Sequence, residues 1–318
     1  KTFVIALSGD AVLEQNFHNI IHDIALLQSI GIRIVVVHGA KPQIDARLLQ
    51  ANIESLFERN VRITDASAMH VIKEAVGSTR FAIEAEFSTG LPNSPMHGSQ
   101  IRVVGGNVIM AKPLGVQDGV DFQLTGQVRR VNAVTIDQHL SLDCVVLLSP
   151  IGFSPTGETF NLSYQDVATN VAISLNAEKL IYISKNSGIS DGNSLLRSLS
   201  LPQVAELQET TKNLEHAELL SAASHACEGG VERVHLVGYQ QDGTLLTELF
   251  TRDGSGTLIT NQCIEVIRSA SIDDVGGILK LITPLEEKAI LVKRSRELLE
   301  NEICQFIVVV HPEGLIIG

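Results

Sequence analysis

The chain has 318 residues, of which 44% are hydrophobic and 19% charged, a composition typical of a folded globular protein rather than a disordered one. Its net charge of −12, from 24 basic and 36 acidic residues, argues against nucleic acid or an anionic membrane surface as a partner, because both attract clustered Lys and Arg. No apolar run approaches the ~18 residues of a membrane span, and the cysteines form no Cys-x-x-Cys pair, so we expect neither a membrane protein nor a metal site.

The first part of the chain alternates between strand and helix patterns. Thr2–Leu7 and Ile32–Val37 are nearly unbroken apolar runs, typical of strands that are buried on both faces of a parallel sheet. Phe17–Ser29, which lies between them, has apolar residues at helical spacing. The repeat predicts right-handed parallel crossovers.

The second of these strands ends in a glycine turn, His38-Gly39-Ala40. Pro42 suits the first turn of the next helix, where its missing N–H has no cost. A strand, a glycine turn and a helix N-terminus can form an anion site at the carboxyl end of a strand, although many α/β proteins have such a turn without a ligand. The sequence leaves both interpretations open.

The rest of the first 258 residues continues the same pattern. We expect helices at Pro42–Gln50, Ala66–Phe87 (with Asp65 as N-cap), Tyr164–Leu175, Pro202–Gln208 and Ala217–Cys227, and strands at Cys144–Leu148, Lys179–Ser184, Val234–Val237 and Leu245–Phe250. Gln241-Asp242-Gly243 predicts a hairpin turn between the last two strands. Ile101–Ala111 alternates around Gly105-Gly106 like a hairpin, and strand-like segments follow within residues 120–134, so we expect an antiparallel middle region.

A polar boundary then separates a shorter second part. Its expected elements are a strand at Glu265–Ala270, a helix begun by the capping pattern of Ser271 and Asp274, a helix at Arg294–Ile303, a strand at Phe306–Val310, a turn at Pro312-Glu313-Gly314 and the start of a strand at Leu315–Gly318. Because a strand needs a partner, we expect this domain to continue past Gly318. The natural N-terminus is likewise expected to precede Lys1.

Several segments resemble known families. Val35-Val36-Val37-His38-Gly39, Asn60-Val61-Arg62-Ile63-Thr64-Asp65 and Ala177-Glu178-Lys179-Leu180 resemble the second strand, the substrate-side segment and a late strand of the amino-acid kinase fold, most closely that of the N-acetylglutamate kinases. Residues 265–318 resemble the opening of a GNAT acetyltransferase. Leu291–Glu300 resembles the segment that contacts glutamate in the bacterial N-acetylglutamate synthases.

This resemblance implies an α/β chain of two domains. Residues 1–258 would form an amino-acid kinase-like domain, an open and mainly parallel sheet sandwiched by helices. Residues 259–264 would be a linker, and residues 265–318 the first part of a GNAT α+β domain. By resemblance the protein should form a homo-oligomer, commonly a hexamer, through the kinase-like domain. We separately expect it to be cytoplasmic.

The resemblance also implies a reaction, the transfer of acetyl from acetyl-CoA to the α-amine of L-glutamate. This is the first step of arginine biosynthesis, with L-arginine as feedback inhibitor. The Gln/Arg-x-x-Gly-x-Gly/Ala turn that holds acetyl-CoA in GNAT enzymes is absent from this sequence, and no general base can be named. We therefore expect this stretch alone to be inactive.

Three positions argue against kinase activity. Phosphoryl transfer depends on cations and a polar organiser around the transferred group. The two lysines and the aspartate that supply these in the related kinases fall on Ala6, Leu219 and Gln165 respectively. The kinase site is therefore expected to be dead.

An arginine site is the role that remains for the first domain. Arginine-inhibited relatives carry a His, a Glu thirteen residues later and a Gly six beyond, and these fall on His235, Glu248 and Gly254. A carboxylate is a forked acceptor for guanidinium, and a carbonyl next to glycine can be approached closely. On spacing alone, His235 could equally be an ordinary strand residue and Glu248 a solvated edge charge.

By resemblance, Arg294 and Val292 would contact the glutamate substrate, and the guanidinium of Arg294 offers paired donors for a carboxylate. The alternative is that the Lys-Arg-Ser-Arg run is only a solvated helix face. Two other functions also stay open for the whole chain. One is an active acetylglutamate kinase with an appended tail, and the other is an arginine-sensing regulatory module without catalysis.

Overall fold

The computed structural model describes residues 1–89, 101–190, 194–211, 213–251, 253–261, 266–288, 290–292, 294–311 and 315–318. These fall into two compact units, Lys1–Ile259 and Thr260–Gly318. The predicted turn at Pro312-Glu313-Gly314 and residues 262–264 of the predicted linker lie outside the described residues.

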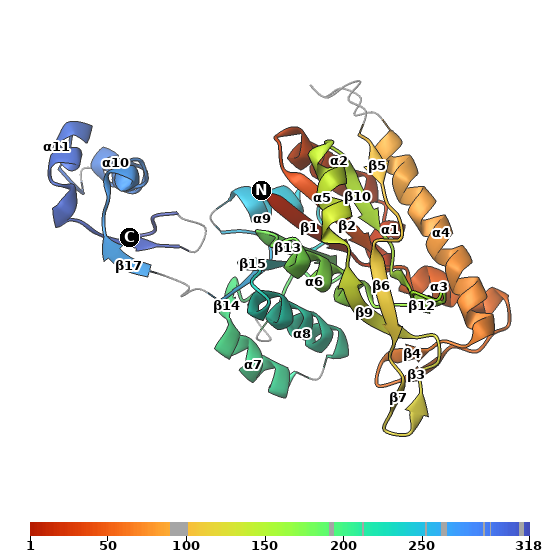
Figure 1. The fold of residues 1–318 in the computed structure, drawn as a ribbon. Coiled ribbons are helices and arrows are strands. Elements are labelled where there is room, and N and C mark those ends of the chain that lie inside the picture. The colour runs from red at the N-terminus through yellow and green to blue at the C-terminus, as the bar shows by residue number, and fades with distance from the viewer. Residues whose placement is uncertain are drawn as a thin grey trace. The chain divides into compact units, whose positions relative to one another are not determined.

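The first unit is built on an eight-stranded sheet in the order β14-β16-β15-β13-β1-β2-β10-β5 (Figure 1). Its strands are β1 (Thr2–Leu7), β2 (Arg33–His38), β5 (Val103–Val104), β10 (Val145–Leu148), β13 (Lys179–Ser184), β14 (Ser198–Ser200), β15 (Arg233–Gly238) and β16 (Thr257–Thr260). The pairs from β15 to β5 are all parallel. This confirms the predicted open, mainly parallel sheet.

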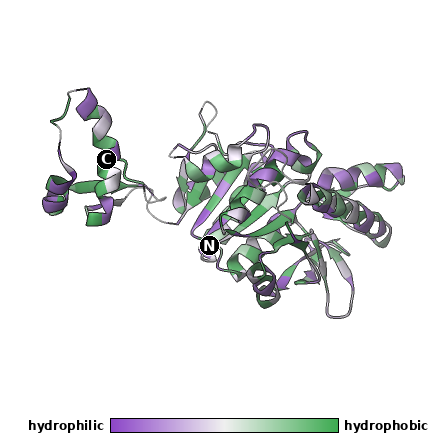
Figure 2. Cartoon of the chain, turned by 90° about the horizontal axis from the view of Figure 1, so that it is seen from above, coloured by the Kyte–Doolittle hydropathy of each residue, from purple (hydrophilic) through white to green (hydrophobic). Residues whose placement is uncertain are grey.

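Helices cover both faces of this sheet. They are α1 (Gly9–Leu13), α2 (Phe17–Ser29), α3 (Lys41–Gln50), α4 (Ala66–Ser88), α5 (Ala133–Ser141), α6 (Tyr164–Ser174), α7 (Leu201–Thr210), α8 (Leu214–Glu228) and α9 (Thr244–Phe250). Within β1, Ile5 packs in one core cluster with α2, α4 and α9, and Val4 packs in the other with α5, α6 and α8. Because successive strand side chains face opposite sides, the continuous apolar runs satisfy both layers. Figure 2 shows the hydrophobic strands between helices whose outer faces are hydrophilic.

A second sheet lies beside the first, in the order β12-β11-β6-β9. It consists of β6 (Ile109–Pro113), β9 (Gly126–Val131), β11 (Ile151–Phe153) and β12 (Thr159–Asn161). This unit also has two short antiparallel pairs, β3 (Leu56–Glu58) with β4 (Val61–Ile63) and β7 (Val116–Gln117) with β8 (Val120–Asp121). The antiparallel pairing of β6 with β9 agrees with the predicted antiparallel middle region.

The predicted hairpin at Ile101–Ala111 is wrong. Val103–Val104 pairs in parallel with β10 in the large sheet, whereas β6 pairs with β9 in the second sheet. Gly105 is required for a different reason than a hairpin turn. A Cβ at this position would lie 2.4 Å from the Leu147 carbonyl oxygen, so the glycine permits the chain to pass closely over β10.

The predicted strand at Leu245–Phe250 is also wrong, because residues 244–250 form α9. Gly243 adopts φ +69 before this helix, so it serves as a left-handed N-cap position rather than as part of a hairpin turn. Leu245 and Glu248 are the buried residues of α9 and lie three positions apart, which is helical spacing. Short apolar runs are ambiguous between strand and helix, and tertiary packing decides here.

The second unit contains an antiparallel pair, β17 (Val266–Ser269) with β18 (Ile307–Val310), together with η1 (Ile272–Asp274), α10 (Val275–Glu287), α11 (Arg296–Asn301) and η2 (Ile303–Gln305). The capping pattern of Ser271 and Asp274 is confirmed, since Asp274 accepts the Ser271 N–H at 2.7 Å. The predicted helix at Arg294–Ile303 is shorter than expected, because Ser295 is the N-cap of α11 and Arg294 precedes it. None of the described helices in either unit could cross a membrane.

Candidate functional site

The predicted effector residues come together beside β15 of the large sheet. His235 projects from β15 and Glu248 from α9, and His235 Nδ1 lies 2.7 Å from Glu248 Oε1. The two side chains are 1% and 7% exposed, respectively. Glu248 is therefore a buried group and not a solvated edge charge. His235 is a strand residue with a specific polar partner.

The other oxygen of Glu248 holds the loop that precedes β16. Glu248 Oε2 accepts the backbone N–H groups of Ser255 and Gly256, each at 2.7 Å. Gly254 lies next to this oxygen and adopts φ +61, and a Cβ at that position would approach Oε2 to 2.6 Å. A side chain at position 254 would thus be strained by its backbone and would clash with the carboxylate.

These hydrogen bonds keep the Glu248 carboxylate ionised. Burial raises the pKa of a carboxyl group, but the hydrogen bond and the charge of His235, with the N–H groups of Gly256 and Ser255, outweigh that effect and lower the pKa of Glu248 below its usual value. An ionised Glu248 requires His235 to donate from Nδ1.

A buried lysine that the sequence did not predict as part of the site extends this network. Lys179 of β13 is 5% exposed, and its Nζ lies 3.4 Å from His235 Nε2. The positive charge balances the buried carboxylate across the imidazole, which lowers the cost of burying both ions. A lysine inside an apolar strand run was the signal in the sequence that could have identified it.

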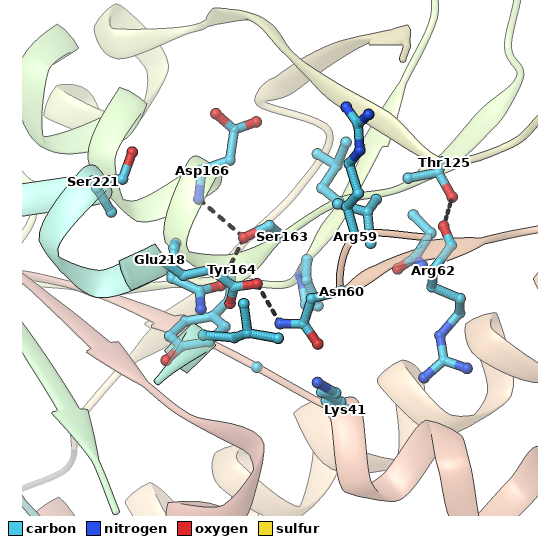
Figure 3. A pocket seen from close by; sticks show the side chains of 18 of the residues that line it. Lys41, Arg59, Asn60, Arg62, Thr125, Ser163, Tyr164, Asp166, Glu218 and Ser221 are labelled. Atoms are coloured by element: carbon cyan, nitrogen blue, oxygen red, sulfur yellow. Dashed lines mark hydrogen bonds between the residues drawn. The ribbon is translucent and has the colours of Figure 1, made fainter. Parts of the chain in front are cut away.

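A cavity of about 620 Å³ opens beside the glycine turn after β2 (Figure 3). Lys41, Asn60 and Arg62 line it from α3 and from the segment that includes β4, and Glu218 lines it from α8. Arg62 pairs with Asp45 and also stacks on the Phe57 ring, 4.5 Å from its centroid, while Asn60 Nδ2 donates to Glu218 Oε1. The glycine turn thus borders a real cavity lined by groups of both charges.

The positions expected to carry kinase chemistry are uncharged. Ala6 is fully buried in β1 and Leu219 of α8 is 4% exposed, so both lie in the apolar core. Gln165 accepts a hydrogen bond from Ser163 Oγ at 2.6 Å at the start of α6. Its neighbour Asp166, which the sequence analysis did not single out, accepts the Val128 N–H at 2.8 Å and thereby ties α6 to β9.

Burial and hydrogen bonds have opposite effects on the Asp166 carboxyl group. Burial raises its pKa, although bonds from Val128 and Asn170 oppose the shift. The carboxyl group therefore ties α6 to β9 while it also lines the cavity. Only a fold-level contact reveals this role, because Val128 lies 38 residues away in the sequence.

In the second unit, the predicted glutamate-binding residues are exposed. Val292 is 85% exposed. The Arg294 N–H donates to Glu286 Oε1 at 2.9 Å, and its guanidinium lies 5.6 Å from the centroid of the Phe306 ring. Stacking on an aromatic face restrains the arginine stem while the guanidinium N–H groups remain able to donate.

A forked ion pair joins β17 to η1 in this unit. Arg268 Nη1 and Nη2 donate to the two carboxylate oxygens of Asp274 at 2.6 and 2.8 Å. The bonds from Arg268, with the Ser271 N–H, lower the pKa of Asp274 well below its usual range. Among the described residues, no group of three or more His, Cys, Asp or Glu side chains is placed to bind a metal ion.

Comparison with known proteins places these features in a family. Residues 1–238 match the model of the amino acid kinase family. The chain is 52% identical to the amino-acid acetyltransferase of Pseudomonas syringae pv. tomato (strain ATCC BAA-871 / DC3000), and it is 51% identical to that of Azotobacter vinelandii (strain DJ / ATCC BAA-1303). In both cases the match covers 100% of this chain and 73% of the relative.

The solved structures agree with this placement. N-acetylglutamate synthase from Neisseria gonorrhoeae, solved with coenzyme A and L-arginine, superposes with a TM-score of 0.88 at 34% identity, over 100% of this chain and 73% of that one. The carbamate kinase of Giardia lamblia has a TM-score of 0.58 at 15% identity over 82% of this chain and 99% of that one, which shows a shared fold alone.

Proposed function

Because the chain belongs to the amino acid kinase family and, over its whole length, to the amino-acid acetyltransferases of the N-acetylglutamate synthase type, we propose that its first unit is an L-arginine sensor. The sensor controls acetyl transfer from acetyl-CoA to the α-amine of L-glutamate. The relative from Neisseria gonorrhoeae was solved with coenzyme A and L-arginine, and a second structure of it with coenzyme A and N-acetyl-glutamate.

One observation carries the arginine assignment. His235, Glu248 and Gly254 lie on separate elements or loops, yet they meet around one buried and ionised carboxylate. A carboxylate of this kind is a natural partner for the guanidinium of arginine, since charge-assisted bonds are strong in a site with little water. Feedback by arginine fits an enzyme at the first step of arginine biosynthesis, and it requires a coupling free energy between the two sites.

The kinase-like domain would serve regulation and assembly, not phosphoryl transfer. The uncharged side chains of Ala6 and Leu219 support this, because they leave no cation at the positions that stabilise the transferred phosphoryl group in related kinases. An active acetylglutamate kinase is therefore the weaker alternative. We place the regulatory domain at residues 1–258, the linker at 259–264 and the start of the acetyltransferase domain at 265–318.

For the acetyltransferase domain, we assign Arg294 to a carboxylate of glutamate and Val292 to the same segment of the substrate site. The exposed guanidinium and its position over Phe306 support this role. In the reaction, the unprotonated α-amine attacks the thioester carbonyl carbon and forms a carbon–nitrogen bond. The carbon–sulfur bond breaks, and the leaving CoA thiolate takes up the proton that the nitrogen loses. The enzyme is proposed to act in the cytoplasm as a homo-oligomer, with a hexamer as the expected state.

Inhibition of the intact acetyltransferase by arginine tests the assignment. The wild-type enzyme should lose activity as L-arginine is added, and L-lysine should have no effect. A Glu248→Ala enzyme should keep its acetyltransferase activity and lose its response to arginine. If that variant stays fully arginine-sensitive, the effector site lies elsewhere. A chain that senses arginine without any acetyl transfer in the intact protein would favour the regulatory module instead.

A further inference from the structure

The Glu248 carboxylate has little capacity left to accept hydrogen bonds. An ionised carboxylate offers about four lone-pair positions on its two oxygens. Oε2 accepts the N–H groups of Ser255 and Gly256, both at 2.7 Å, and Oε1 accepts Nδ1 of His235 at 2.7 Å. One acceptor position is left, and it is on Oε1.

A guanidinium group that binds as a fork needs a free acceptor position on each carboxylate oxygen. Its two parallel N–H donors bind a carboxylate as a fork, with one bond to each oxygen. Because Oε2 is filled by two backbone N–H groups, a fork can form only if at least one of them is released. A forked guanidinium and the closed loop therefore compete for the same oxygen.

We infer that L-arginine binds at Glu248 by displacing the N–H groups of Ser255 and Gly256, so that the loop of residues 254–256 is the moving part of the effector site. This inference rests on the proposed arginine site. Glu248 is then a latch with two partners, the loop in the absence of effector and the guanidinium in its presence.

The remaining bonds of the loop limit how far it moves. Ser255 Oγ donates to the Thr244 carbonyl oxygen at 2.8 Å, and Arg197 Nη1 donates to the Gly254 carbonyl oxygen at 3.0 Å. A Cβ on Gly256 would lie 2.0 Å from the Leu236 carbonyl oxygen, so the loop is packed directly on β15. Release of the two N–H groups thus changes the local backbone and does not unfold the loop.

The loop of residues 254–256 directly precedes the strand that leads into the second unit. Thr257, the next residue after Gly256, begins β16, and the second unit begins at Thr260, the last residue of that strand. The Thr257 hydroxyl also accepts the Ile189 N–H at 2.9 Å. A rearrangement at 255–256 therefore acts on the start of the strand that leads into the acetyltransferase domain.

Hydrogen–deuterium exchange of the backbone amides, read at single residues by mass spectrometry, tests this inference. The chain is measured with and without saturating L-arginine, with L-lysine as control, and calorimetry on the same samples establishes binding. Loss of a charge-assisted hydrogen bond should raise the exchange rates of Ser255 and Gly256 about tenfold. Unchanged or slower exchange while arginine binds would overturn the latch and leave the arginine site intact. Absence of binding would overturn both.

A variant gives a second measurement. Glu248→Gln keeps the shape of the side chain but offers one acceptor oxygen and no charge, so the Ser255 and Gly256 amides should exchange quickly even without arginine. Glu206→Gln is the matched control, since Glu206 is exposed on α7 and the substitution removes the same charge. If Glu248→Gln protects both amides as well as the wild type does, the carboxylate does not hold the loop and the inference fails.

Discussion

His235 Nδ1 and Glu248 Oε1 lie 2.7 Å apart in the interior of the first unit, although the two residues are thirteen positions apart on different elements. Because Glu248 is ionised, the imidazole donates to it from Nδ1. The helix of residues 244–250 directs Glu248 inward toward β15. The geometry of the proposed effector site therefore depends on the local fold of α9 against β15.

Glu248 should make the stability of the first unit depend on pH. Its pKa in the folded chain is below the ordinary value of 4.5, so its contribution to the free energy of unfolding is fully present above that value and is lost as the pH falls through the folded pKa. Urea denaturation at a series of pH values should show a wild-type advantage over Glu248→Gln that shrinks in acid. An advantage that stays constant as the pH falls would contradict this account of Glu248.

Asp23 should have the opposite effect. Burial, with the nearby charge of Asp242, raises its pKa to about 6, so the folded state loses stability as the pH rises from about 4 through 6. Asp23→Asn should therefore raise the free energy of unfolding by about 1 kcal/mol at neutral pH, after allowance for its partial exposure. The gain should vanish near pH 4. Glu54→Gln, at an exposed site, is the control and should change little.

Arg294 should matter for glutamate and not for acetyl-CoA. Arg294→Met in the intact enzyme removes the paired donors but keeps much of the stem over Phe306, so the KM for glutamate should rise roughly tenfold or more. The KM for acetyl-CoA should be unchanged, and Val292→Ala should have a smaller effect on glutamate. Steady-state kinetics with each substrate varied in turn measure this. An unchanged KM for glutamate would show that Arg294 is only a surface residue.

The kinase-like domain should not phosphorylate N-acetylglutamate. Ala6 and Leu219 are buried apolar residues, and one missing electrostatic contact alone can cost about 10²–10³ in rate. A coupled assay with ATP, magnesium and N-acetylglutamate should give only the background rate, with an acetylglutamate kinase as positive control. Turnover comparable to that control would contradict the assignment.

The large sheet could be predicted because its strands are continuous apolar runs. Every residue of β1 is buried, and such a run has few alternatives to a central parallel strand. The errors fall where short segments are ambiguous. Residues 244–250 form a helix that packs Leu245 and Glu248 inward, and Gly105 marks a close approach to Leu147 and not a turn. Both features depend on tertiary contacts that local patterns do not contain.

The arrangement of the proposed effector site could be predicted only in part. Spacing and resemblance indicated His235, Glu248 and Gly254, but not that backbone N–H groups of the next loop fill one oxygen of the carboxylate. Backbone donors leave no mark in the sequence. Contacts such as Asn60 with Glu218, 158 positions apart, were likewise beyond it, because no local pattern joins elements that the fold brings together.

Calorimetric titration of L-arginine into this chain, with L-lysine as control, decides whether the first unit senses arginine. We expect saturable binding that is specific for arginine and is lost in Glu248→Gln but kept in Glu206→Gln, because Glu248 supplies a buried carboxylate and Glu206 does not. Arginine binding of equal affinity in Glu248→Gln, or no binding to the wild-type chain, would contradict the assignment of this site as the arginine sensor.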